Sequence, residues 1–200
     1  MWVVKIGGSL NHDPALPQWL DLLCQLGGGR VTIVCGGGPF ADQVRRAQSH
    51  WRFDDLPAHN MAVLAMAQSA YLAHGLNPKL RIVDSKAEML RVLHSGQCAL
   101  WLPMEWLRDK PGPYTNWDNS SDSIALDLAR EVNAERMLLV KSCAIDPAAA
   151  LEDLGAAGVL DRRFITLAGG AAFPIDILHH SELARARSLL LGDYRPIGSA

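Results

Sequence analysis

Two apolar runs near the start of the chain each pass directly into a cluster of glycines. Val3-Val4-Lys5-Ile6 leads into Gly7-Gly8-Ser9, and Ile33-Val34-Cys35 leads into Gly36-Gly37-Gly38-Pro39. Short β-branched runs of this kind are typical of strands that are buried on both faces of a parallel sheet. Glycine directly after such a strand permits a tight turn or the close approach of backbone to a ligand. The two loops therefore predict an α/β fold with a binding edge at its strand ends.

The rest of the chain continues the alternation of strands and helices. The expected strands are residues 2–6, 31–35, 80–83, 99–102, 137–140, 164–167 and 188–191, with a further edge strand at the C-terminus. The expected helices are residues 14–26, 40–51, 58–74, 86–93, 121–132, 148–154 and 173–178. This order predicts a single domain over residues 1–200, an α/β three-layer αβα sandwich with a mostly parallel central sheet.

Composition excludes several classes of protein. With 49% hydrophobic and 20% charged residues, the 200-residue chain is an ordinary globular protein and not a disordered one. A formal net charge of -2 offers no electrostatic attraction to nucleic acid. No apolar stretch approaches the ~20 residues that span a membrane, and no signal peptide precedes the first glycines, so we expect a cytoplasmic protein.

The cysteines and histidines are scattered along the sequence. The four cysteines form no C-x-x-C pair and stand in or beside apolar runs, which is typical of small buried side chains in a reducing compartment. His179 and His180 are neighbours, so they would not share a metal ion easily. We therefore expect no metal site built from protein side chains alone.

The glycine loops have a bland interpretation and a functional one. Each could be only a turn from strand to helix, as Gly27-Gly28-Gly29 is before its strand. Two such loops within 40 residues favour a phosphate site, because backbone N–H groups at a helix N-terminus attract anions. Lys5 supports this, since a lysine in an apolar strand needs an anionic partner. Neither loop matches the P-loop or the dinucleotide fingerprint.

A second polar group lies at Trp117-Asp118-Asn119-Ser120-Ser121-Asp122-Ser123, directly before an apolar helix. One or two of these residues would suffice for an N-cap. The excess of hydroxyls and carboxylates indicates that some of them project into a crevice.

At this point the sequence resembles the amino acid kinase family. The motifs that carry the resemblance are Lys5-Ile6-Gly7-Gly8-Ser9, Gly36-Gly37-Gly38-Pro39, Asn119-Ser120-Ser121-Asp122-Ser123-Ile124-Ala125 and Leu139-Val140-Lys141-Ser142-Cys143-Ala144-Ile145-Asp146. Gly192 with Ile197-Gly198-Ser199 is similar to the family's closing strands. The resemblance implies an acceptor-binding half at residues 1–115 and a nucleotide-binding half at residues 116–200.

Within the family, two segments look like the subgroup that phosphorylates (5-(aminomethyl)furan-3-yl)methyl phosphate in methanofuran biosynthesis, in the form found in methylotrophic bacteria. These segments are Ala58-His59-Asn60-Met61-Ala62 and Trp117-Asp118-x-x-Ser121-Asp122-Ser123. The resemblance implies transfer of the γ-phosphoryl group of ATP, with Mg²⁺, to a small phosphate monoester.

The resemblance also implies roles for individual residues. Lys5 and Asp122 would be catalytic. Nucleotide binding would fall to Gly7, Gly8, Ser9, Lys141, Asp146, Arg162 and Arg163. Acceptor binding would fall to Gly36, Gly37, Gly38, Asp42, Arg45, His59 and Asp118, with Asp42 facing an aminomethyl group and Tyr114 and Trp117 lining a flat ring. Which of Lys141, Arg162 and Arg163 is the second phosphate-stabilising cation stays open.

The sequence is also compatible with other acceptors and with a non-catalytic protein. The acceptor could be a nucleoside monophosphate, isopentenyl phosphate or an amino acid carboxylate. A non-catalytic nucleotide- or oxyanion-binding protein of the same fold is the rival from another class. Relatives pair through first-half helices, so the resemblance also implies a homo-oligomer.

Overall fold

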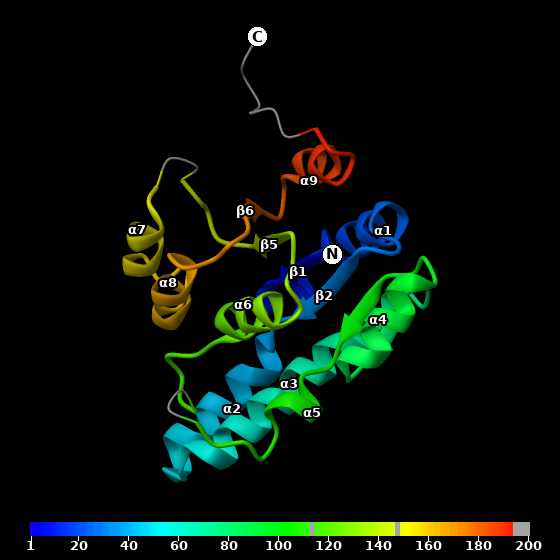
Figure 1. Cartoon of the computed structure of the whole chain (residues 1–200). Coiled ribbons are helices and arrows are strands. Elements are labelled where there is room, and N and C mark those ends of the chain that lie inside the picture. Colours follow the sequence, from blue (N-terminus) through cyan, green and yellow to red (C-terminus); the bar gives the residue numbers. More distant parts are fainter. Residues whose placement is uncertain (113–114, 147–148, 194–200) are drawn as a thin grey trace.

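The computed structural model of the chain describes residues 1–112, 115–146 and 149–193, and these form one six-stranded parallel sheet with helices on both faces (Figure 1). The strands are β1 (Trp2–Ile6), β2 (Val31–Cys35), β3 (Arg81–Val83), β4 (Ala99–Trp101), β5 (Arg136–Lys141) and β6 (Ile175–His179). Their order is β3-β4-β2-β1-β5-β6, and every pairing is parallel. The predicted fold class is confirmed.

The helices follow the strands along the chain. They are η1 (Gly8–His12, a short 3-10 helix), α1 (Leu16–Leu26), α2 (Gly38–Trp51), α3 (Asp55–Leu76), α4 (Lys86–His94), α5 (Met104–Leu107), α6 (Ser121–Glu131), α7 (Leu151–Ala156), α8 (Arg162–Ala168) and α9 (Leu183–Leu190). None of the helices in the described part of the chain is long and apolar enough to cross a membrane.

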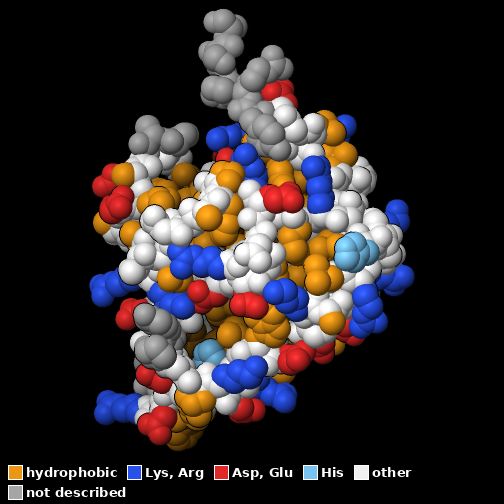
Figure 2. Space-filling model, in the orientation of Figure 1, with side chains coloured by type: hydrophobic (Ala, Val, Ile, Leu, Met, Phe, Trp, Pro, Cys, Tyr) orange, Lys and Arg blue, Asp and Glu red, His pale blue; other side chains and the backbone are white. Residues whose placement is uncertain are grey.

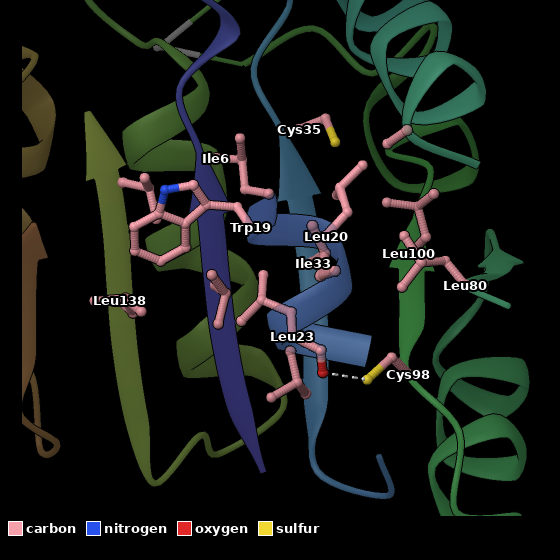
Figure 3. Packing of buried hydrophobic residues seen from close by; sticks show 14 of the residues in the cluster. Ile6, Trp19, Leu20, Leu23, Ile33, Cys35, Leu80, Cys98, Leu100 and Leu138 are labelled. Carbon is pink, nitrogen blue, oxygen red and sulfur yellow. Dashed lines mark hydrogen bonds between the residues drawn. The ribbon is translucent and has the colours of Figure 1, made fainter. Parts of the chain in front are cut away.

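Side chains of β1 alternate between two hydrophobic cores, one on each face of the sheet. Val4 and Ile6 join the core that α1 and α9 cover, and Val3 joins the core that α4, α6 and α8 cover. Figure 3 shows the first core, where Trp19 and Leu20 of α1 lie over the sheet. This alternation, which follows from the two-residue period of a strand, turns Lys5 toward α6.

The chain order places the switch point of the sheet beside β1. The chain builds β2, β3 and β4 on one side of β1 and then returns to build β5 and β6 on the other. In open α/β sheets ligands bind where the strand order reverses, at the carboxyl ends of the strands. Lys5 of β1 and Lys141 of β5 both stand near this point.

Three predicted elements in the last third of the chain are wrong. Residues 164–167, expected as a strand, belong to α8, which buries Phe164 and Ala168 four residues apart. Residues 173–178, expected as a helix, contain β6, whose Leu178 and Ile177 pack on opposite cores. Residues 188–191, expected as a strand, largely belong to α9. Short apolar runs fit either period, so the neighbouring elements decide which forms.

The four cysteines are free thiols, and two of them are fully buried. Burial raises the pKa of Cys35 and of Cys98 to about 12, so neither thiol ionises near neutral pH. Cys143 is exposed, which the sequence did not predict. The expected strand at the C-terminus and the Ile197-Gly198-Ser199 motif lie outside the described residues, as does Tyr114.

Candidate active site

A cleft of about 650 Å³ opens at the carboxyl ends of β1, β2 and β5. Helices α2 and α3 form one wall, and α6 with residues 158–161 forms the other. Figure 2 shows this side of the molecule hollowed between α2 and α6, with charged side chains at the rim. A cleft of this size accommodates a small molecule.

Two glycine loops form the base of the wall that includes α2 and α3, and their backbones touch. A Cβ on Gly8 would lie 2.1 Å from the backbone nitrogen of Gly38, and one on Gly36 would lie 2.6 Å from the nitrogen of Gly8. Gly38 also has a φ of +51°. The first reason for glycine here is therefore the packing of one loop against the other.

The same contact brings two helix N-termini to the cleft. The loop of β1 enters η1 at Gly8, and the loop of β2 enters α2 at Gly38. The first N–H groups of a helix have no acceptor within it, so those of Gly8, Ser9 and Gly38 can receive an anion. This arrangement is what the sequence predicted for a phosphate site.

Three buried charges stand at the inner end of the cleft. Asp122 Oδ1 forms an ion pair with the Lys5 ammonium group at 2.7 Å, and Asp122 Oδ2 accepts a hydrogen bond from the Lys141 ammonium group at 2.5 Å. The Lys141 Nζ also donates to the carbonyl oxygen of Val159 at 2.7 Å. All three charged residues are buried. Lys5 therefore has a carboxylate of the protein as its anionic partner, whereas the sequence analysis expected a phosphate in that place.

Asp122 and Lys141 have shifted pKa values in this cluster. Burial opposes ionisation of Asp122, but the two lysines outweigh it and hold the pKa of this carboxyl below its usual value. Burial and the charge of Lys5 lower the pKa of Lys141, and Asp122 only partly offsets them. With all three groups ionised, two cations and one anion leave an excess positive charge facing the cleft.

Asp161 accepts hydrogen bonds from residues at the N-terminus of α6. Its Oδ2 accepts the N–H and the hydroxyl of Ser120 at 3.1 and 2.6 Å and the N–H of Ser123 at 3.1 Å. Its Oδ1 accepts the Ser123 hydroxyl and the N–H of Phe164, the latter at 2.7 Å. One carboxylate thus caps α8 and ties it to the first turn of α6.

The outer end of the cleft carries an aromatic wall. The Arg45 guanidinium lies 4.4 Å from the ring centroid of Trp117, and the indole N–H of Trp117 donates to Gln48 at 2.6 Å. The amide of Gln48 donates in turn to Asp55 Oδ1 at 2.8 Å. A loop from the second half of the chain is thereby docked on α2 and α3 of the first half.

The predicted residues divide into those that line the cleft and those that do not. The lining includes Lys5, Gly8, Ser9, Gly37, Gly38, Asp42, Arg45, His59, Asp122 and Lys141. Gly7, Gly36, Asp118, Asp146, Arg162 and Arg163 stand outside it. Gly7 and Gly36 support the loops through backbone bonds to Val140 and Ile6.

The residues outside the lining have other surroundings. Asp118, Asp146 and Arg162 are exposed. Arg163 contacts Asp127 at 2.5 Å and Asn119 at 3.0 Å. Among the cations weighed for the second position, Lys141 alone lines the cleft. His59 keeps a contact with the Leu107 carbonyl oxygen at 3.0 Å.

Sequence reasoning missed Asp161, Gln48 and Asp55 as parts of this site. Asp161 stands three residues before Phe164, the usual spacing of an N-cap, and an expected strand over 164–167 concealed that signal. Nothing in the local sequence marks Gln48 or Asp55, because their roles depend on the docking of a distant loop.

Residues 1–144 match the sequence model of the Amino acid kinase family, and this range includes the glycine loops, Asp122 and Lys141. The chain belongs to the amino acid kinase family. It is 25% identical over 142 residues to the [5-(aminomethyl)furan-3-yl]methyl phosphate kinase of Methanocaldococcus jannaschii. The match takes in 70% of this chain and 64% of that relative, so the chain spans less than two thirds of the relative's length.

Solved structures of kinases share the fold. The uridylate kinase of Archaeoglobus fulgidus superposes with a TM-score of 0.71 at 12% identity, over 96% of each chain. The UMP kinase of Bacillus anthracis gives 0.68 at 16% identity, over 96% of this chain and 91% of that one. The aspartate kinase of Synechocystis gives 0.63 at 17%, over 90% of this chain and 38% of that one.

Proposed function

We propose that the protein is an ATP-dependent phosphotransferase that transfers the γ-phosphoryl group to a small phosphate monoester. The observation that carries the proposal is the pair of buried ammonium groups on Asp122, at the edge where two helix N-termini meet. The excess positive charge and the free N–H groups suit a transferring phosphoryl group, whose charge is spread over its oxygens.

In the proposed reaction an oxygen of the acceptor phosphate forms a bond to the γ-phosphorus while the bond from that phosphorus to the β,γ-bridging oxygen breaks. The products are a diphosphate and ADP. The acceptor is already anionic, so no general base is required, and catalysis rests on position and charge. Lys5 and Lys141 would stabilise the phosphoryl oxygens, and Asp122 would hold both lysines in place.

Within this proposal Lys141 is the second phosphate-stabilising cation. Its ammonium group lies on the same carboxylate as that of Lys5, whereas Arg163 contacts Asp127 and Asn119. Residues 1–115 would bind the acceptor and residues 116–200 the nucleotide. The exposed residues Asp146 and Arg162 would contact the outer part of the nucleotide. In the described residues no group of three or more His, Cys, Asp or Glu side chains could hold a metal ion. We therefore propose that Mg²⁺ enters with the phosphates of ATP, since it needs few protein ligands.

The proposed acceptor is (5-(aminomethyl)furan-3-yl)methyl phosphate, as the named relative suggests. Its amine would meet Asp55 at the outer end of the cleft. Asp42, expected in this role, contacts the Arg45 guanidinium at 2.9 Å, whereas the Asp55 carboxylate accepts a hydrogen bond from the neutral amide of Gln48. The ring of Trp117 beside it suits a flat aromatic acceptor.

A coupled assay of ADP release, with a panel of phosphate monoesters, tests the proposal. We expect turnover with the aminomethylfuran phosphate and little with uridylate or isopentenyl phosphate. Lys5→Met should lose on the order of 100- to 1,000-fold in kcat, because it removes a charge that stabilises the transition state. Lys86→Met, which removes an exposed lysine on α4, is the matched control and should keep wild-type kcat.

The rival function, a non-catalytic nucleotide- or oxyanion-binding protein, makes a different prediction. It expects ATP to bind without turnover of any acceptor, including carboxylates. ADP release with an acceptor and none without it would exclude the rival.

We also propose that copies of the chain associate through α3. Met61, Leu64 and Tyr71 are exposed and recur every three or seven residues along this helix, as one face of a helix requires. In keeping with the free thiols, the proposed location is the cytoplasm.

A further inference from the structure

We propose that Asp161 is a positioning residue that keeps Asp122, and through it Lys141, in place for phosphoryl transfer. The inference rests on the proposed function, which supplies the phosphoryl transfer. The positioning itself is argued from the contacts of Asp161 in the second half of the chain. Asp161 contacts neither lysine. It acts through the first turn of α6 and through Val159, which lies two residues before it and accepts a hydrogen bond from Lys141.

The contacts around Asp161 form a closed circuit. Its carboxylate holds the backbone of Ser120 and Ser123, the residues on either side of the turn that carries Asp122. Asp122 contacts Lys141, and Lys141 donates to the Val159 carbonyl oxygen, two residues before Asp161. The circuit therefore returns to the segment from which it started.

The first turn of α6 depends on this carboxylate. The N–H of Ser123 donates to Asp161 at 3.1 Å. The N–H of Asp122 donates to the hydroxyl of Ser120 at 3.3 Å. That hydroxyl is itself a donor to Asp161. Removal of the carboxylate would release both serines and let Asp122 shift away from the lysines.

A shift of Asp122 would have a measurable electrostatic effect. The groups that face Lys141 are Lys5 on β1, Asp122 on α6 and the neighbouring Cys143. Burial and Lys5 already lower the pKa of Lys141, and Asp122 is its principal counterion. Lys141 should therefore release its proton at lower pH when Asp122 moves.

The test is Asp161→Ser, which keeps a hydroxyl to cap α8 but offers one neutral oxygen in place of two charged ones. We expect kcat to fall on the order of 100-fold, as for other misplaced catalytic groups. We also expect the Lys141 ammonium, followed by side-chain ¹⁵N NMR, to titrate at lower pH than in the wild type. Ser123→Ala removes one hydroxyl bond to Asp161 and keeps the backbone N–H bond of residue 123, so it should shift both readouts in the same direction by less.

The control is Ser85→Ala, which removes the N-cap of α4, where the Ser85 hydroxyl accepts the Glu88 N–H at 3.3 Å. It should lower stability without changing kcat or the titration of Lys141. A wild-type titration in Asp161→Ser, or an equal shift in Ser85→Ala, would overturn the inference. If the wild type proves inactive while Asp161→Ser still shifts the titration, the proposed function fails and the positioning role stands.

Discussion

The two walls of the cleft reach the same edge of the sheet by different means. The wall from the first half is built on backbone, since Gly8 and Gly38 pack against each other with no space for a side chain. The wall from the second half is built on charge, since Asp122 pairs with Lys141 and the Asp161 carboxylate holds Ser120 and Ser123 on either side of Asp122. The first wall needs correct shape, and the second needs every charged partner to be present.

The largest effect should follow from breaking the charged wall. Asp122→Ala leaves two buried ammonium groups without their counterion, and we expect a loss of about 3–5 kcal/mol in the free energy of unfolding. Urea denaturation measures it. Glu131→Ala, which breaks an exposed pair with Lys86, should cost no more than about 1 kcal/mol. Equal losses in the two variants would contradict the contrast.

A smaller effect should follow from breaking the backbone wall. Gly8→Ala places a methyl group against the Gly38 backbone, which cannot rotate away, and we expect a loss of about 1–3 kcal/mol. Gly75→Ala, in α3 with no atom within 4 Å of its added Cβ, is the matched control. It should be neutral or stabilise by about 0.5–1 kcal/mol. A tolerated alanine at position 8 would show that the loops can separate.

The smallest effect should appear as a pH dependence of the charged wall alone. The pKa of Lys141 lies below its ordinary value of 10.5, so the folded chain releases this proton before the unfolded chain does. In that window the unfolded state binds more protons, and this group makes stability rise as pH increases. Activity that needs charged Lys141 should fall over the same window.

Lys141→Arg separates this effect from the titration of other groups, because the guanidinium stays charged. Relative to the wild type, its activity should persist to higher pH, and its rise in stability should be absent. The measurements are kcat and urea midpoints from neutral pH to about pH 10.5. Identical alkaline profiles in the two proteins would remove Lys141 from the proposed mechanism.

Much of the fold could be predicted from the sequence because the first five strands are short and mostly apolar, with few polar residues in each. The strands over residues 2–6 and 31–35 agree with the structure residue for residue. The last third could not be predicted in the same way, because residues 164–167 and 188–191 are too short to distinguish a strand from a helix. There the cap of Asp161 and the packing of α9 on α1 select the helix.

The candidate site divides along similar lines. Lys5, the glycine loops, Asp122 and Lys141 were predicted as parts of one site through the resemblance to the amino acid kinase family. The structure brings them to one cleft at the carboxyl ends of the parallel strands. Asp161 was missed because its partners Ser120 and Ser123 are 38 to 41 residues away, and Asp55 because its place in the site depends on the docking of Trp117 on Gln48. Arg162 and Arg163 were expected to bind nucleotide only because they were the cations nearest in sequence.

The parallel sheet, its glycine loops and the residue types at its edge follow from the amino-acid sequence, because they depend on local periodicity and on the strand ends. The packing of the loops on each other, the sharing of Asp122 by Lys5 and Lys141, and the hold of Asp161 on α6 appear only in the folded chain. Those contacts join residues 19 to 117 positions apart, from Lys141 with Asp122 to Lys5 with Asp122, and no local pattern encodes which distant partner a buried charge will find.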